Sequence, residues 1–112
     1  MVTPSVGSVV LVRFPFSDLS ASKLRPAVVL AGVDRDDWIL SQVTSNPYSD
    51  TRAVELDDFD FVSGSLQRTS YVRPGKLFSA NSSIMERIAG ELKQQKLTSI
   101  IDSVIDVLRP TP

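Results

Sequence analysis

The chain contains no cysteine and no histidine among its 112 residues. Without cysteine it has no disulfide, no thiolate nucleophile and no sulfur-ligated zinc, which fits a reducing compartment. Without histidine it has no histidine-based triad, no imidazole acid–base pair and none of the usual catalytic zinc sites. Any chemistry must therefore come from carboxylates, hydroxyls, lysine, arginine or tyrosine.

Long hydrophobic runs and a strong net charge are also absent. No apolar run approaches the roughly eighteen residues of a membrane helix, and the opening "MVTPSVGS" lacks the basic and apolar parts of a signal peptide. The formal net charge is −1 and the sequence pI is about 5.3, so the totals do not indicate nucleic-acid or membrane binding. We therefore expect a soluble, cytoplasmic protein with no membrane partner. Its length and its 42% hydrophobic content predict one domain over residues 1–112.

What the chain does have is a succession of strand signals. Segments rich in β-branched residues predict strands at Gly7–Phe14, Pro26–Val33, Asp37–Ser45 and Thr51–Leu56. After an acidic stretch, Thr69–Ser79 predicts two short strand pieces bent by Pro74 and Gly75, and Ser83–Leu92 alternates as a strand does, although its composition also suits a helix. The unbroken apolar run in Pro26–Val33 predicts a strand covered on both faces, either in a small barrel or under a dimer interface.

The tail follows a different period. Its apolar residues step by three and four, as in a helix: Leu97, Ile100, Ile101, Val104, Ile105 and Leu108. This stripe predicts a helix over Lys93–Leu108 that packs on the sheet and is stopped by Pro110, with Lys93 as a poor N-cap. The expected fold is mainly β (α+β), with strongly curved antiparallel strands and a C-terminal helix.

Arg25 stands directly before Pro26 at the start of the apolar strand. A residue before proline is held extended, so the direction of the Arg25 side chain is restricted. If the strands on either side of Asp34–Asp37 form an antiparallel hairpin, Arg25 and Thr44 are neighbours. A guanidinium beside a hydroxyl suits an anion such as a phosphate. The alternative is an ordinary solvated arginine at a strand edge.

Short polar side chains surround this position in the sequence. The preceding loop supplies Ser17, Ser20, Ser22 and Lys23, and the next strand ends in Thr44, Ser45 and Asn46. Further basic residues are Arg13, Arg52, Arg68, Arg73 and Lys76, whereas acidic residues cluster in Asp34–Asp37 and Glu55–Asp60. This segregation predicts a basic face behind a net acidic total, unless the charged loops are merely solvated.

Four stretches in this order resemble the MazF/PemK family of bacterial toxins: "GSVVLVRFPFSDLSASKLRPAVVLA", a strand that ends in "VTS", "SYVRPGKLFS" and the helix-forming tail. The resemblance spans nearly the whole chain. It implies a small SH3-like barrel of curved antiparallel strands with a C-terminal helix, and a homodimer. The expected dimer interface is the apolar surface of the Pro26–Val33 strand or of the helix.

The same resemblance implies a toxin of a type II toxin–antitoxin system, an endoribonuclease that cuts single-stranded RNA (mRNA) without metal or cofactor. The family's catalytic arginine before proline falls on Arg25, and its catalytic threonine at the strand end falls on Thr44. The 2′-hydroxyl of the RNA would attack the adjacent phosphorus and leave 2′,3′-cyclic phosphate and 5′-hydroxyl ends. Arg25 would stabilise the developing charge, and Thr44 would hydrogen-bond a phosphate oxygen.

Further expectations concern RNA and protein partners. The expected RNA-binding residues are Arg13, Phe14, Ser17, Ser22, Lys23, Ser45, Asn46 and Arg73. A cognate antitoxin with an extended, often acidic segment is expected near the RNA groove.

The chain also departs from the family. Its loop before Arg25 reads "SDLSASK", and Gly75 stands where some members carry an aspartate in a Val-Arg-x-Asp sequence. Two other functions stay open. One is a gyrase-poisoning toxin of similar fold, although those toxins lack the Arg-Pro and Thr-Ser pairs. The other is a non-catalytic binding module, which Gly75 favours.

Overall fold

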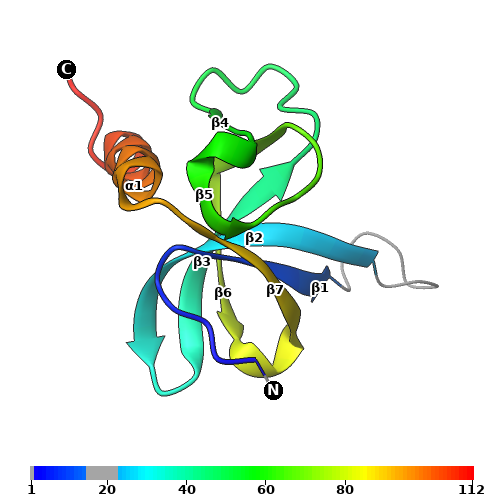
Figure 1. The fold of residues 1–112 in the computed structure, drawn as a ribbon. Helices are drawn as coiled ribbons and strands as arrows, with labels where there is room; N and C mark the ends of the chain where they lie inside the picture. The colour runs from blue at the N-terminus through cyan, green and yellow to red at the C-terminus, as the bar shows by residue number, and fades with distance from the viewer. Residues whose placement is uncertain (1, 15–22) are drawn as a thin grey trace.

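A computed structural model describes residues 2–14 and 23–112 of the chain. The elements follow one another as β1 (Ser8–Phe14), β2 (Lys23–Asp34), β3 (Asp37–Thr44), β4 (Val54–Leu56), η1 (Asp58–Asp60), β5 (Phe61–Gly64), β6 (Ser70–Asn81), η2 (Ser82–Ile84), β7 (Met85–Leu92) and α1 (Gln94–Leu108). The strands come first and the one long helix comes last (Figure 1).

The seven strands of the described residues form one sheet in the order β4-β6-β3-β2-β1-β7-β5, and every pairing is antiparallel. The sheet curls so far that its two edge strands approach each other: Leu56 of β4 and Phe61 of β5 belong to the same buried cluster (Figure 1). This curled half-barrel with a C-terminal helix confirms the predicted mainly β, SH3-like barrel architecture.

Strand β2 is buried on both faces, as its apolar run predicts. Residues 27–30 are all buried, and successive side chains enter opposite clusters because side chains alternate along a strand. Val28 joins Val9 in one cluster, whereas Val29 joins Val10 in the other. The chain itself therefore covers residues 27–30, and the exposed apolar side chain that the predicted strand still offers to the expected dimer interface is Val33, at 59% exposure.

Helix α1 packs on the sheet with only part of the predicted stripe. Leu97, Ile100 and Val104 are buried in the cluster that contains Leu56 and Phe61, since they lie on one side of the helix. Ile105 and Leu108 are 53% and 69% exposed. The expectation that the whole stripe packs on the sheet is therefore wrong, since these two apolar side chains remain exposed on the helix. As predicted, Lys93 makes no side-chain capping bond.

Strand β6 runs unbroken through the bend that its sequence predicts. Val72 faces Val43 and Leu77 faces Ser41, so residues 73–76 stand opposite the single residue Gln42 of β3. Pro74 offers no amide hydrogen to a ladder and Gly75 has no side chain, which makes them natural residues for such an irregularity. The predicted bend is therefore a bulge within one strand and not a break between two.

Some short elements are new or begin later than the sequence indicates. Strand β4 begins at Val54 because Thr51 and Arg52 form a turn. Strand β5 follows a turn of 3-10 helix that Asp57 and Asp60 close with a capping box, and neither element is expected from the acidic stretch. Strand β7 settles the Ser83–Leu92 ambiguity in favour of a strand, which begins at Met85 after the short helix η2.

The close approach of β5 to β7 generates a stability prediction. Gly64 faces Gly90, and a Cβ on Gly90 would lie 2.6 Å from the Ser63 carbonyl oxygen. We therefore expect Gly90→Ala to lower the free energy of unfolding by roughly 1–3 kcal/mol through overpacking. Urea unfolding measures this change. Gly75→Ala is the matched control, since a Cβ there meets nothing within 4 Å. Equal unfolding midpoints for the two variants would contradict the described β5–β7 contact.

Candidate functional site

A pocket of about 310 Å³ opens where β2 begins and β3 ends. It is lined by ten residues: Leu11, Leu24, Arg25, Pro26, Val43, Thr44, Ser45, Leu66, Arg68 and Ser70. Three of the residues that the sequence singles out, Arg25, Thr44 and Ser45, therefore share one site. We call this the Arg25–Thr44 pocket.

The β2–β3 hairpin explains why Arg25 and Thr44 meet. The strands turn at Asp34–Asp37, as predicted, and Ala27 faces Gln42 in the register. Two residues nearer the start of β2 and two residues nearer the end of β3, the same register places Arg25 opposite Thr44, with both side chains on the same face of the sheet. The pocket thus depends on local pairing in one hairpin, although its remaining wall comes from elsewhere in the chain.

Arg68 is the residue that sequence reasoning missed as a member of this site. It comes from the connection between β5 and β6, and it lines the pocket with Arg25. Among the residues that the structure describes, neither guanidinium has a carboxylate partner within 4 Å. The pocket therefore presents two cations whose hydrogen-bond donors suit the oxygens of an anion.

Other basic residues of the predicted basic face are neutralised by carboxylates. Arg13 binds Glu86 at 2.6 Å, and Arg52 binds Asp106 at 3.2 Å, both near the surface. Arg73 binds Asp50 at 3.0 Å in a more sheltered place. Of the basic residues predicted for this face, Arg68 and Lys76 have no carboxylate within 4 Å among the described residues, and Arg68 is the one that lines the Arg25–Thr44 pocket.

The Thr44 hydroxyl is already hydrogen-bonded within its own turn. Its Oγ1 donates to the Asn46 carbonyl oxygen at 3.1 Å and accepts from the Asn46 amide at 3.2 Å. A hydroxyl has a single hydrogen, so Thr44 can donate to a bound anion only when that hydrogen leaves the Asn46 carbonyl. Asn46 thereby shapes the turn and does not line the pocket.

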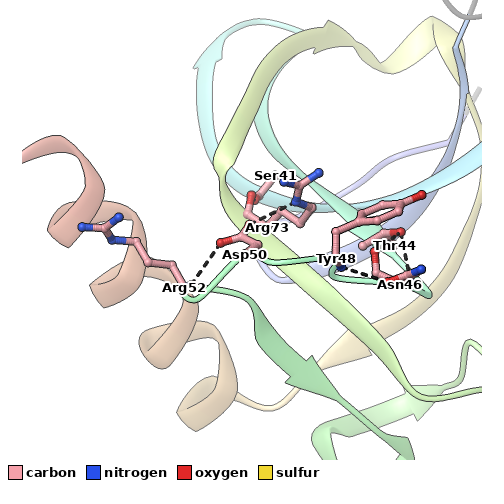
Figure 2. A network of polar contacts seen from close by, with 7 residues as sticks. All are labelled: Ser41, Thr44, Asn46, Tyr48, Asp50, Arg52 and Arg73. Atoms are coloured by element: carbon pink, nitrogen blue, oxygen red, sulfur yellow. Dashed lines mark hydrogen bonds and ion pairs between the residues drawn. The ribbon is translucent and has the colours of Figure 1, made fainter.

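The turn continues from Asn46 to Arg52 and is bonded at both ends (Figure 2). The Asn46 side-chain oxygen accepts from the Tyr48 amide at 2.8 Å. At the other end, the Asp50 carboxylate accepts from Arg73 Nε at 3.0 Å and from the Arg52 amide at 3.0 Å. The turn is therefore fixed to β3 on one side and to β6 on the other.

Arg73 lies in a different pocket from Arg25. This second pocket, of about 360 Å³, is lined by Ser49, Asp50, Thr51, Arg52, Arg73, Gly75, Lys76 and Val107. The carboxylate beside Arg73 comes from Asp50 of the turn, whereas position 75, where some family members carry aspartate, holds a glycine. The Asp50–Arg73 pair could not be predicted from sequence patterns because the two residues are far apart in the chain.

The surroundings of the Asp50 carboxyl change its titration. Burial by itself would raise its pKa, but hydrogen bonds from Arg73 and from the Arg52 amide, with the charges of both guanidiniums, outweigh it and hold the pKa below 3.8. Asp50 is therefore ionised at neutral pH, and its pairing with Arg73 stabilises the folded state there.

The remaining predicted site residues are less well placed or less fully described. Lys23 is exposed at the first position of β2, and Arg13 is paired with Glu86. Phe14 is described only as the last residue of β1, while Ser17 and Ser22 lie outside the described residues. Over ranges 2–14 and 23–112, no cluster of three or more Asp or Glu side chains is placed to hold a metal ion. No helix in those ranges is long and apolar enough to cross a bilayer.

Comparison with known proteins gives matches among solved structures only. No protein-family model and no curated protein matches the sequence. An endoribonuclease bound to its cognate antitoxin, from a mycobacterial species, superposes with a TM-score of 0.74 over 98% of this chain and 100% of its own, at 15% identity. The MazE–MazF complex of Deinococcus radiodurans gives a TM-score of 0.71 over 99% and 100% of the two chains, at 19% identity.

The chain has the MazF toxin fold. The toxin MazF-mt6 of Mycobacterium tuberculosis superposes too, with a TM-score of 0.68 and 11% identity, over 90% of this chain and 95% of that one. The predicted resemblance is thereby confirmed for the fold across nearly the whole chain.

The Asp50–Arg73 pair generates a pH-dependent prediction. We expect Asp50→Asn to lower the free energy of unfolding at pH 7 by about 1–2 kcal/mol, since a charge-assisted hydrogen bond is lost. The folded-state pKa of Asp50 lies below its ordinary value of 3.8. The advantage of the wild type is therefore full above that value and disappears as the pH falls through the folded-state pKa. Urea unfolding at pH 7, 5 and 3 measures the difference.

Asp106→Asn is the control for this experiment. It breaks the exposed Arg52–Asp106 pair, whose side chains are 48% and 50% accessible, so the loss should stay within about 0–1 kcal/mol. A difference between wild type and Asp50→Asn that is the same at pH 7 and pH 3 would contradict the described pairing.

Proposed function

We propose that this protein is the toxin of a type II toxin–antitoxin system and that it cleaves single-stranded RNA within the Arg25–Thr44 pocket. The observation that carries the proposal is that one pocket on a MazF fold contains both the Arg25 guanidinium and the Thr44 hydroxyl. Among the described residues, Arg25 has no carboxylate partner. Structural neighbours named as endoribonucleases support the same chemistry.

The proposed reaction uses the RNA's own nucleophile. The ribose 2′-hydroxyl oxygen bonds to the adjacent phosphorus and loses its proton, the bond from phosphorus to the 5′ oxygen breaks, and that oxygen gains a proton. The products are a 2′,3′-cyclic phosphate and a 5′-hydroxyl end, and no metal ion is required. Because the attacking group is the 2′-hydroxyl, RNA is a substrate and DNA is at most a ligand.

Arg25 stabilises the charge that develops on the phosphorane in this mechanism, and it is the candidate proton donor to the leaving oxygen. A planar guanidinium binds two oxygens at once and can hold them as the phosphorus changes geometry. Arg68, which lines the same pocket, adds a second positive charge. Thr44 donates its hydrogen to a phosphate oxygen after releasing the Asn46 carbonyl.

The proposed partners follow from the same surface. Neighbouring structures include an endoribonuclease bound to its cognate antitoxin and a MazE–MazF complex, and we extend that partnership to this chain. An acidic antitoxin segment would complement Arg25 and Arg68.

We also propose a cytoplasmic homodimer in which the exposed Ile105 and Leu108 side chains of α1 contribute to the interface. A monomer in sedimentation at micromolar concentration would count against the dimer.

Cleavage of a long single-stranded RNA in EDTA tests the activity. Arg25→Ala is expected to lower the cleavage rate by about a thousandfold and Thr44→Ala by about a hundredfold, because each removes a donor to the charged transition state. Thr44→Ser, which keeps the hydroxyl, should retain most of the rate. Product ends are mapped to identify the cyclic phosphate and the 5′-hydroxyl.

Arg35→Ala is the matched arginine control, since Arg35 lies at the hairpin turn, at the other end of β2 and β3 from the pocket. It is expected to cut like the wild type. Normal cleavage by Arg25→Ala would show that the site assignment is wrong. If the folded wild type cuts no RNA of varied sequence, the fold would instead serve a gyrase-poisoning or other non-catalytic binding function.

A further inference from the structure

Tyr48 is an exposed aromatic residue in an unfavourable backbone conformation. Its relative exposure is 75%, and its φ is +56°, in the left-handed region that bulky residues rarely adopt. An exposed ring gains nothing from burial, and the strain is retained only where neighbouring contacts impose it. Neither property benefits the folded chain by itself, which suggests that the ring acts on something outside it.

The contacts that impose this conformation are those of the Asn46–Arg52 turn. On one side of Tyr48, its amide is bonded to the Asn46 side chain, and the Asn46 backbone is bonded to the Thr44 hydroxyl. On the other side, Asp50 donates its amide to the Pro47 carbonyl and binds Arg73 through its carboxylate. The ring is therefore presented from a turn that is fixed at both ends.

The turn also places Tyr48 next to the proposed cleavage site. Thr44, which lines the pocket, is four residues away in the chain, a span of at most about 14 Å. Figure 2 shows the Tyr48 side chain extending from the turn toward Thr44. A nucleotide whose phosphate lies between Arg25 and Thr44 would have its own base, or that of its neighbour, within reach of this ring.

The surroundings of Tyr48 favour a nucleic acid over a protein as the occupant. Aromatic anchors at protein interfaces lie among other apolar residues that exclude water. The neighbours of Tyr48 in the turn are Ser45, Asn46, Pro47, Ser49 and Asp50, all polar except Pro47, and none of the other exposed large apolar residues belongs to this turn. Beside a cationic pocket, a single exposed ring in a polar setting matches the stacking sites of single-stranded nucleic acids.

We propose that Tyr48 is a stacking platform for one base of the single-stranded RNA, adjacent to the phosphate that is cut. This proposal rests on the proposed function and adds a residue that positions the substrate. Stacking does not depend on base identity, so Tyr48 contributes affinity and alignment whichever sequence is cut.

The test is single-turnover cleavage of a long RNA at increasing enzyme concentration, which separates the half-saturating concentration from the maximal rate. Tyr48→Asn removes the ring but suits a left-handed backbone, because asparagine tolerates positive φ. We expect it to raise the half-saturating concentration about tenfold, with thermal stability equal to or above that of the wild type. Tyr48→Phe keeps the ring and should behave like the wild type. Ser49→Ala is the control from the same turn.

Salt dependence adds a readout that a merely structural role would not move. The slope of log affinity against log salt counts neutralised phosphates, so it should be unchanged in Tyr48→Asn and smaller in Arg25→Ala.

An unchanged half-saturating concentration in Tyr48→Asn, beside a wild type that cuts, would overturn the platform and leave the proposed function intact. Equal defects in Tyr48→Phe and Tyr48→Asn would assign the effect to the hydroxyl and overturn it too. Weaker self-association in Tyr48→Asn would mark Tyr48 as a protein contact and overturn it as well.

Discussion

The arrangement of the whole molecule depends on the burial of β1 and β2 on both faces. Val9 and Val28 enter one cluster, while Val10 and Val29 enter the other. A shift of the β1–β2 register by one residue would exchange these faces and place each side chain in the wrong cluster. The register of the central strands is therefore fixed by packing on two sides at once, and Arg25 takes its position from it at one end of β2.

Charge is arranged as selectively as the apolar residues. Arg13, Arg52 and Arg73 each bind a carboxylate, so they fasten elements together: β1 to β7, the β3–β4 turn to α1, and the same turn to β6. By contrast, the guanidiniums of Arg25 and Arg68 in the Arg25–Thr44 pocket form no ion pair with a described carboxylate. A protein of net charge −1 can thus offer a local site for an anion without a broadly basic surface.

Local patterns predicted the features that depend on neighbouring residues in the chain. The apolar run after Arg25 predicted a strand covered on both faces, and the hairpin at Asp34–Asp37 predicted the approach of Arg25 to Thr44. Features that depend on distant segments were not predictable in this way. Arg68 reaches the pocket from the β5–β6 connection, and Asp50 of the β3–β4 turn binds Arg73 in the bulge of β6. Strand β5 was not predicted, because its four residues end in glycine and show too little alternation of apolar and polar side chains to indicate a strand.

The internal hydrogen bond of Thr44 has a consequence for selectivity among anions. An oxygen atom that enters the pocket competes with the Asn46 carbonyl for the one hydrogen of the hydroxyl, and such a bond is worth about 0.5–1.5 kcal/mol. A small ion such as inorganic phosphate has few other contacts with which to offset this loss. A polymer that reaches several surfaces at once can offset it easily. If the pocket binds RNA as proposed, the resting turn would therefore favour extended ligands over the abundant small anions of a cell.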